Sequence, residues 1–231
     1  MTSRSLFIIG FTFVSTYFAM GQRSGIITYA ETIERNWRNR SFTEENTWKL
    51  AFTDSVAICT WVKPDEDEPQ VSAGGVTIRS FRRQIEDHYV TYPRKKEVED
   101  QREIFNKIFI VNGQYLDRKW KITGKQGVVL GYPCIEATLT MDTITILAWF
   151  TPRIPIGIGP REWRGLPGMI LHMELDNGRH VITATKIEVD SPPSEADLQI
   201  PEKKKGEEIA WSEFEALRKE KEAEAREMFG R

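Results

Sequence analysis

Residues 131–171 read GYPCIEATLTMDTITILAWFTPRIPIGIGPREWRGLPGMIL, and this stretch decides the fold. Its first part alternates side chains with a period of two from Cys134 to Met141, and then continues from Thr143 to Thr151 with β-branched and aromatic residues. That period is typical of β-strands, and β-branched and aromatic residues favour the pleated surface of a sheet. We therefore predict two antiparallel strands connected at Asp142-Thr143.

The second part of the stretch is dense in proline and glycine. Prolines recur through residues 152–168, where they prevent a continuous helix and remove donors from a sheet ladder. We interpret this segment as a shaped loop. Aromatic, Met and branched apolar side chains on and beside it either form a surface for a ligand or partner or fill the end of the sheet as core. These residues are Trp149, Ile154, Ile156, Trp163, Leu166 and Met169.

A second hairpin follows the loop directly. Residues 169–175 and 181–189 both alternate with a period of two, and Asp176-Asn177-Gly178 separates them. Asn-Gly between two such runs is a strong hairpin signal, because these residues tolerate the positive φ of tight turns. A two-residue and a three-residue loop are both open. We favour the longer one, because it places Met173 opposite Val181 and keeps one face apolar.

Strand patterns also occur nearer the amino terminus, at residues 25–33 and 48–59. If the second alternation is uninterrupted, Cys59 falls on the face opposite Leu50. The acidic, Pro/Gly-rich segment 63–75 reads as a solvated loop, and residues 78–111 fit helix and strand templates equally. The sequence therefore predicts a mainly β single domain, a long curved antiparallel sheet or half-barrel.

The first 21 residues have the layout of a secretory signal peptide. Arg4 precedes an apolar run, and Ala19 and Gly21 are small residues suited to cleavage after Gly21. The apolar run is shorter than the ~20 residues of a membrane-spanning helix. We expect an exported protein, in the periplasm or cell envelope or secreted, with no transmembrane span after cleavage. Without residues 1–21 the net charge is −3, which gives no attraction for nucleic acid.

The predicted domain organisation is a signal peptide at 1–21, a β-rich domain at 22–190 and a charged tail at 191–231 with a short helix. Ser212 and Glu215 fit a capping box at the start of that helix. Its apolar contacts would be sparse, namely Phe214, Leu217 and Met228. We expect a largely solvated terminal helix, with docking against the body or a partner as the alternative.

The sequence singles out little chemistry. Cys59 and Cys134 are the two cysteines, and an exported compartment permits them to form a disulfide, although two buried free thiols are the alternative. The histidines, His88, His172 and His180, have no metal-ligand spacing. In the favoured register His172 and His180 share a solvated face. We find no nucleophile elbow and no phosphate loop, and we predict no catalytic residue, no cofactor and no metal.

The sequence resembles the GLPGLI family of exported proteins, common in Bacteroidota, and the resemblance is concentrated in residues 131–170. The family pattern is matched by Gly131-Tyr132-Pro133-Cys134, Ala148-Trp149-Phe150-Thr151, Ile154-Pro155, Gly159-Pro160 and the named motif Gly165-Leu166-Pro167-Gly168-Met169-Ile170. Met169 stands where the family usually has Leu, a volume-conserving difference. The resemblance implies an exported, mainly β domain without an established reaction. By analogy its shape is that of the half-barrels of periplasmic lipoprotein carriers.

Two functions follow as expectations. The first is a non-enzymatic envelope protein that binds a lipid, peptide or protein partner through an apolar concave face or the loop 152–168. The alternative is an enzyme of unknown type, such as a hydrolase, with a carboxylate site that the sequence does not identify. The GLPGLI-like motif itself is better interpreted as setting shape, because Gly165 and Gly168 permit unusual backbone angles and Pro167 fixes the angle between them.

Overall fold

The computed structural model describes residues 23–37, 40–64, 72–73, 76–77, 87–104, 107–141, 144–189, 191–202 and 205–229. The predicted signal peptide lies outside these residues. The elements are β1 (Gly25–Trp37), β2 (Arg40–Phe52), β3 (Ala57–Val62), β4 (Ser72–Ala73), β5 (Val76–Thr77), β6 (His88–Tyr92), β7 (Glu97–Ile104), β8 (Lys107–Gln114), β9 (Lys121–Val129), β10 (Tyr132–Met141), β11 (Ile144–Thr151), β12 (Met169–Leu175), the 3-10 turn η1 (Asp176–Gly178), β13 (His180–Glu188), β14 (Glu207–Ala210) and α1 (Trp211–Phe229).

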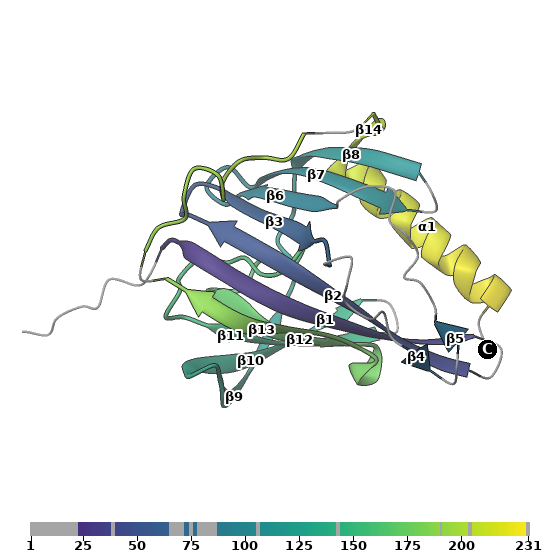
Figure 1. The fold of residues 1–231 in the computed structure, drawn as a ribbon, viewed down its shortest axis with the longest axis horizontal. Coiled ribbons are helices and arrows are strands. Elements are labelled where there is room, and N and C mark those ends of the chain that lie inside the picture. The colour runs from purple at the N-terminus through teal and green to yellow at the C-terminus, as the bar shows by residue number, and fades with distance from the viewer. Residues whose placement is uncertain are drawn as a thin grey trace, which may run out of the picture.

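Twelve of these strands form one curved sheet (Figure 1) in the order β14-β8-β7-β6-β3-β2-β1-β13-β12-β11-β10-β9, and β4 pairs separately with β5. Neighbouring strands are antiparallel except β14 and β8, which are parallel. The sheet is open, with β14 and β9 at its two edges. The predicted fold class, a mainly β half-barrel with a carboxyl-terminal helix, is confirmed. The segment that fitted both templates at the sequence level contributes β6, β7 and β8.

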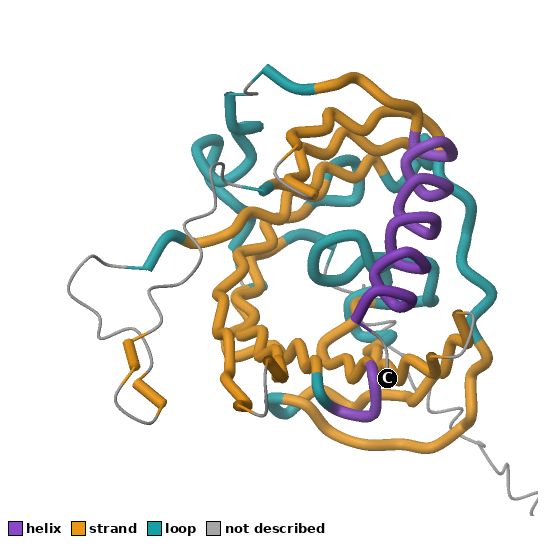
Figure 2. The backbone as a smooth tube through the Cα atoms, turned by 90° about the vertical axis from the view of Figure 1, so that its right-hand side faces the viewer, coloured by secondary structure: helices purple, strands orange, loops and turns teal. Residues whose placement is uncertain are grey.

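The strands form because their side chains alternate between a buried and a more exposed face. In β1, Ile27, Tyr29 and Glu31 are at most 1 % exposed, whereas Thr28 and Ala30 between them are not buried. Such alternation places one face of each strand on the core. Figure 2 shows the strands curving around loop segments, with α1 lying across the open side. The main apolar cluster accordingly joins strand residues to residues of the loop 152–168.

Both predicted hairpins are present. β10 and β11 pair with Ala137 opposite Ala148, and the predicted connection at residues 142–143 lies outside the described residues. β12 and β13 also pair, but the register that we favoured is wrong. Met173 lies opposite Ile182, because the connection runs through the 3-10 turn and sets Leu175 opposite His180. Ile182 therefore enters the core, with an exposure of 0 %.

The environment of Cys59 also differs from the sequence-based expectation. Residues 53–56 form a turn between β2 and β3, so the alternation is interrupted and Cys59 pairs opposite Leu50, facing the core. Cys59 and Cys134 are both buried and free, so the disulfide left open by the sequence is not formed. Five strands lie between β3 and β10 in the sheet order, a path of about 29 Å along the sheet, and a disulfide requires Cα atoms within about 7 Å.

The tail is docked rather than solvated at its start. β14 extends the sheet beside β8, and α1 follows it without a break. Phe214, in the first turns of α1, is 1 % exposed and meets the ring of Phe109 edge to face at 5.7 Å. Val111 completes this small cluster. The expectation of a largely solvated helix is therefore wrong here, because this apolar contact fixes its amino-terminal half; the side chain of Met228 lies outside the described residues.

Candidate functional site

The loop 152–168 folds back on itself inside the concave side of the sheet. Its backbone makes ladder-like hydrogen bonds: the N–H of Met169 donates to the carbonyl of Ile154 at 2.9 Å, and the N–H of Ile170 donates to that of Ile158 at 2.9 Å. A β-bridge joins Ile158 to Arg164. The loop is thus a compact structure with its own hydrogen bonds, which rigidly positions the side chains at its tip, residues 160–164.

The glycines of the GLPGLI-like motif serve this shape. Gly165 has φ 98°, in the region that favours glycine. A Cβ at Gly168 would lie 2.3 Å from the backbone oxygen of Thr151, so the close approach of two backbone segments requires glycine there. The hydroxyl of Tyr29 donates to the carbonyl of Ile170 at 2.8 Å and ties the end of the motif to β1.

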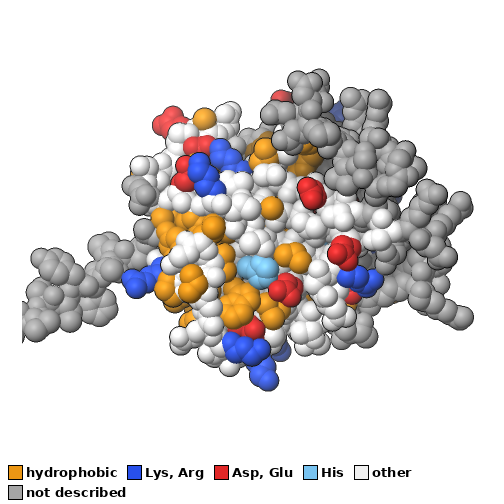
Figure 3. Space-filling model, turned by 60° about the horizontal axis from the view of Figure 1, so that its bottom comes forward, with side chains coloured by type: hydrophobic (Ala, Val, Ile, Leu, Met, Phe, Trp, Pro, Cys, Tyr) orange, Lys and Arg blue, Asp and Glu red, His pale blue; other side chains and the backbone are white. Residues whose placement is uncertain are grey.

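The six residues predicted as a partner or ligand surface divide into two groups. Ile154, Ile156, Trp163, Leu166 and Met169 are at most 6 % exposed and lie in the core cluster. Trp149 is only partly buried and pairs beside His172 on the outer side of the sheet. Figure 3, which brings the underside of Figure 1 forward, shows apolar side chains around a histidine on one outer face. Contact of any of the six residues with a partner stays a prediction.

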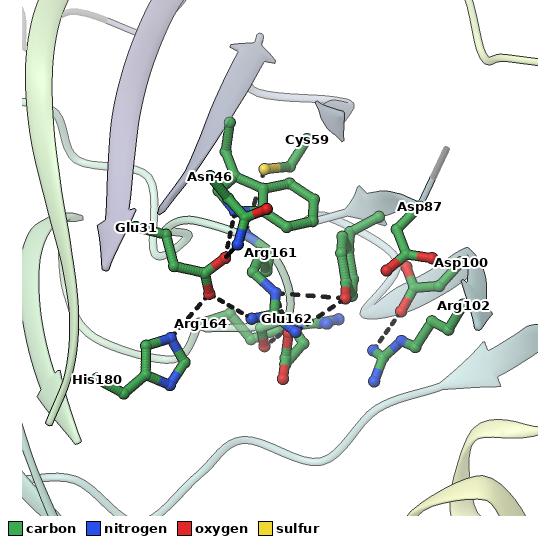
Figure 4. Close-up of polar contacts among 12 residues, drawn as sticks. Glu31, Asn46, Cys59, Asp87, Asp100, Arg102, Arg161, Glu162, Arg164 and His180 are labelled. Atoms are coloured by element: carbon green, nitrogen blue, oxygen red, sulfur yellow. Dashed lines mark hydrogen bonds and ion pairs between the residues drawn. The ribbon is translucent and has the colours of Figure 1, made fainter. Parts of the chain in front are cut away.

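Charged side chains converge beneath the loop tip (Figure 4). Glu31, which is 1 % exposed, is the centre of one half of this network. Its Oε1 accepts from Arg161 Nη1 at 2.6 Å and contacts His180 Nε2 at 2.8 Å. Its Oε2 accepts from Trp48 Nε1 at 2.8 Å and Asn46 Nδ2 at 3.1 Å. Each carboxylate oxygen therefore has two partners, and we call this half the Glu31 side.

The partners of Glu31 determine its protonation. Burial raises the pKa of Glu31, but Arg161, His180 and Trp48 outweigh it and hold the pKa well below its ordinary value. Burial lowers the pKa of Arg161, and Tyr89 and Glu31 reverse this, so the pKa ends well above its ordinary value. Both groups are charged across the physiological range. Arg161 also has φ 54°, a strained backbone angle for a side chain this large.

Two further groups beside Arg161 are kept neutral. The Nε and Nη2 atoms of Arg161 donate to the hydroxyl of Tyr89 at 3.3 and 3.2 Å, and its backbone N–H donates to the sulfur of Cys59 at 3.2 Å. Burial raises the pKa of Cys59 to about 12, and it likewise raises the pKa of Tyr89 above its ordinary value. Cys59 is therefore a protonated thiol and a weak nucleophile at neutral pH.

The other half of the network surrounds Glu162, and we call it the Glu162 side. Arg102 donates from Nη2 to Asp100 at 2.5 Å, and its guanidinium lies 4.8 Å from the ring centre of Tyr89 and 4.9 Å from that of Phe214. Burial raises the pKa of Glu162, but Arg161, Arg102 and Arg118 lower it to about 2. Glu162 is therefore ionised; its Oε2 forms a long ion pair with Arg161 Nε at 3.5 Å but has no hydrogen-bond partner among the described residues.

Two arginines on this side are poorly compensated. Arg164 is 3 % exposed; its Nε donates to the carbonyl of Glu162 at 3.1 Å, and its Nη1 has no hydrogen-bond partner within the described part of the chain. Arg118 stacks 4.4 Å from the ring centre of Trp163 and donates from Nη1 to the sulfur of Met141 at 3.1 Å. Burial lowers the pKa of Arg118 and of Arg164.

The sequence patterns did not predict this network, although a signal for part of it exists. Glu31 occupies the apolar face of β1, at the same phase as Ile27, Tyr29 and Ile33. Asp100 and Arg102 likewise occupy the buried phase of β7, at exposures of 0 % and 4 %. A charge at the buried phase of a strand requires a partner, and that requirement was the clue. The tip residues 160–164 have no comparable signal, because a loop has no period.

The histidines do not share one face. His172 lies on the outer side, where its Nδ1 contacts Thr183 Oγ1 at 2.7 Å and its Nε2 contacts Glu174 at 3.0 Å. His180 points inward to Glu31, so the predicted common face is wrong, because the register of the hairpin is shifted by one residue from the favoured one. Over the described residues, no group of three or more His, Cys, Asp or Glu is arranged to hold a metal. None of the described helices is long and apolar enough to cross a bilayer.

Comparison with known proteins places the chain near a family described as "Protein of unknown function (Porph_ging)", which matches residues 79–172. PNGF-II in two crystal forms is similar in structure, with TM-scores of 0.55 and 0.50 at 15 % and 16 % identity. These matches cover 84 % and 83 % of this chain, and 33 % and 32 % of the PNGF-II chains, so the chain spans about a third of their length.

A putative outer membrane lipoprotein-sorting protein domain from Vibrio parahaemolyticus also matches, at 11 % identity and a TM-score of 0.29, over 78 % of this chain and 91 % of that domain. The curated proteins gave no match. At these identities the similarity to PNGF-II concerns the fold alone, and the family match covers less than half of the chain.

Proposed function

We propose that the protein is an exported, non-enzymatic member of the GLPGLI family that binds a lipid, peptide or protein partner in the cell envelope, through the concave side of the half-barrel beneath the loop 152–168. The observation that carries this proposal is the buried charged network at the loop tip. Burying charge costs several kcal/mol per ion unless it is well paired. A network that retains incompletely paired charges against aromatic rings has the composition of a binding site.

The protonation states of the network favour binding over catalysis. General acids and bases work best with a pKa near the operating pH. The pKa values of Glu31 and Glu162 both lie far below neutrality, and that of Cys59 lies far above it. The charged groups thus keep fixed charges at neutral pH, which suits recognition of a ligand.

The enzyme alternative is supported by one observation, the convergence of carboxylates and a histidine in the interior. Glu31 and His180 are in contact at 2.8 Å, and Glu162 and Asp100 lie in the same network. However, each oxygen of Glu31 is already occupied by two partners. A carboxylate so occupied has no free position from which to take a substrate proton. Glu162 Oε2 does lack a hydrogen-bond partner among the described residues, but its pKa of about 2 makes it a weak base, so we place the enzyme second.

Native mass spectrometry of the full chain purified from its own envelope tests this proposal. We expect a bound small molecule, peptide or protein at near-stoichiometric occupancy. A photo-crosslinking residue placed at Leu116, which is 78 % exposed beside Arg118, should capture it. The matched control is the same residue at Thr145, which is exposed on the outer face of β11.

Three results would contradict the proposal. The absence of any co-purifying species together with no crosslink at Leu116 removes the binding function. Crosslinks at Thr145 alone move the binding surface to the outer face. Chemical conversion of the bound species during incubation, when the same species is stable in buffer, replaces the binding protein with an enzyme.

A further inference from the structure

Arg118 and Arg164 differ from the other arginines of the network in what they bind. Arg102 and Arg161 each contact a buried carboxylate, at 2.5 and 2.6 Å respectively. Within the described residues, neither Arg118 nor Arg164 has a carboxylate within the 4.0 Å of an ion pair. Their hydrogen-bond acceptors among the described residues are a thioether sulfur for Arg118 and a backbone carbonyl for Arg164. Thioether sulfur is a weak acceptor, so most of their N–H groups are free to donate.

The electrostatic consequence is visible in the direction of each pKa. Burial lowers the pKa of Arg102, and Asp100 and its neighbours more than reverse this, so the pKa rises above its ordinary value. For Arg118 and Arg164 burial lowers the pKa, and nearby acids such as Glu162 do not reverse it. These two cations are therefore under-compensated, and an added negative charge would stabilise them.

Aromatic side chains fix the orientation of both guanidinium groups. Arg118 stacks on Trp163, and Arg164 stacks on Tyr115 at 4.5 Å. Trp120 meets Trp163 edge to face at 6.3 Å, and its Nε1 donates to the carbonyl of Arg164 at 2.9 Å. Each guanidinium carbon lies over an aromatic ring, and a guanidinium that stacks on a ring face keeps the N–H groups in its plane available. That is the arrangement in which arginine holds a carboxylate or phosphate through paired hydrogen bonds.

The two arginines also lie close together and near solvent. An added Cβ at Gly165, the residue after Arg164, would be 3.5 Å from the backbone nitrogen of Arg118. Arg118 lowers the pKa of Glu162, and Arg164 donates to the carbonyl of that same residue. Arg164 is buried, whereas Arg118 is partly exposed and Leu116 beside it is 78 % exposed. A ligand can approach from the side of residues 116–119 and place its charged end inward.

We propose that Arg118 and Arg164 form a binding site for an oxyanion, a carboxylate or phosphate group, at the tip of the loop 152–168. The proposal deepens the proposed function by naming the charged group of the ligand, and it rests on that function only for the biological source of the group. The group belongs either to a free anion or to the head of an amphiphile, whose chain the exposed Leu116 would contact.

Isothermal titration calorimetry at constant ionic strength distinguishes these sources. The probes are acetate, inorganic phosphate, decanoate and decyl phosphate, each below its micelle concentration, with chloride as the background anion. We expect saturable binding with one site per chain. Tighter binding of decanoate or decyl phosphate than of acetate or phosphate identifies an amphiphile head group, whereas equal affinities identify a free anion.

The variants Arg164→Met and Arg118→Met should each weaken oxyanion binding at least tenfold, the effect of losing one charge-assisted pair. Arg164→Lys should weaken it less than Arg164→Met, because the charge remains while the fork geometry is lost. The matched control Arg94→Met removes an exposed arginine and should leave binding unchanged. Far-ultraviolet circular dichroism and the unfolding midpoint of each variant confirm that the fold is retained.

The absence of oxyanion binding by the wild-type chain overturns the inference, and so does binding that both Met variants retain in full. If the wild-type chain binds no oxyanion, the N–H groups of Arg118 and Arg164 donate to water alone. A species that co-purifies equally with the wild-type chain and Arg164→Met, and crosslinks at Leu116, would leave the binding function standing and remove the oxyanion site. Oxyanion binding by the purified chain without any co-purified species would leave the oxyanion site standing and remove the proposed binding function.

Discussion

The two sides of the buried network contain the same types of side chain but pair them differently. On the Glu31 side, both carboxylate oxygens have two partners each. On the Glu162 side, three buried atoms, Arg102 Nε, Glu162 Oε2 and Arg164 Nη1, lack hydrogen-bond partners among the described residues. A fully paired buried charge stabilises one conformation, whereas a partly paired one costs free energy that a ligand can offset. We therefore expect a structural role for Glu31 and, under the proposal above, a binding role for Arg164.

The largest effect should come from breaking the paired side. Arg161→Met leaves Glu31 buried without its cation, and removing one partner of a buried ion pair costs about 3–5 kcal/mol. We expect the free energy of unfolding, measured by guanidinium chloride titration at pH 7, to fall by that amount. Arg94→Met, which removes an exposed ion pair with Asp54, should change it by less than about 1 kcal/mol. A loss at Arg161 as small as that at Arg94 would show that the network does not hold the loop.

The second largest effect on the free energy of unfolding should come from lowering the pH. The pKa of Glu162 is about 2 in the folded chain against an ordinary value of 4.5, so the ionised form is favoured by folding. Its contribution to stability is fully present above pH 4.5 and is lost as the pH falls towards 2, on the order of 3 kcal/mol. Denaturant titrations between pH 5 and about 2 measure this loss.

Glu162→Gln is the matched variant for the acid prediction, because it removes the titrating group without changing its shape. Its free energy of unfolding should fall less steeply than that of the wild-type chain over the same pH range. Glu31 also has a lowered pKa and remains in the variant, so some acid sensitivity persists. Identical pH profiles for the two proteins would contradict the assignment of the loss to Glu162.

Changes in the GLPGLI-like motif should disturb the Glu31 side and the Glu162 side equally, because the loop that ends in this motif carries both Arg161 and Arg164. In Gly168→Ala the new Cβ would meet the Thr151 backbone oxygen at 2.3 Å, and relieving that overlap should cost about 2–3 kcal/mol. Gly178→Ala is the matched control, with φ 83° and nothing within 4 Å of the added Cβ, and should cost about 1 kcal/mol from the backbone angle alone. The midpoints of thermal unfolding of the two variants measure these costs, and the midpoint should be lower for Gly168→Ala than for Gly178→Ala. Equal costs would mean that Thr151 moves freely and that the motif does not fix the loop.

The sequence predicted the positions of the strands along the chain better than it predicted their register and the faces of their side chains. β10, β12 and β13 follow from a period of two and β11 from its β-branched and aromatic residues, because both signals are local properties of the chain. Register is less local. The turn at residues 176–179 places Ile182 rather than Val181 in the core, and the turn at residues 53–56 reverses the face of Cys59. One residue gained or lost in a turn changes every face after it.

The candidate site was beyond sequence patterns for a related reason. Its members come from β1, β2, β3, β6, β7, β13, the segment 115–120 and the loop tip, and pairs such as Glu31 and His180 are 149 positions apart. Glu31 was visible as a charge on the apolar face of a predicted strand, whereas Asp100 and Arg102 lie in a segment that fitted helix and strand templates equally. Its partner Arg161 could not be assigned, because the path of a proline-rich loop depends on tertiary contacts such as that between Tyr29 and Ile170. The helix α1 docked for a similar reason, since one buried ring, Phe214, outweighs its polar composition.

The smallest effect on stability should be the sharpest test of the comparison. Arg164→Met removes a hydrogen bond to the Glu162 carbonyl and the stacking on Tyr115, each about 1 kcal/mol. It also removes an under-compensated buried cation, and replacing such a charge with an apolar side chain of similar size is often neutral or stabilising. We therefore expect the free energy of unfolding to change by less than about 1 kcal/mol in either direction. A loss of about 3 kcal/mol or more, equal to that of Arg161→Met, would mean that the two sides are one structural unit and that Arg164 is already satisfied. If the stability of Arg164→Met stays near the wild-type value while oxyanion binding is lost, the structural role and the binding role are separate. Both roles would then be carried by residues 161–164 of one loop, the structural role by Arg161 and the binding role by Arg164.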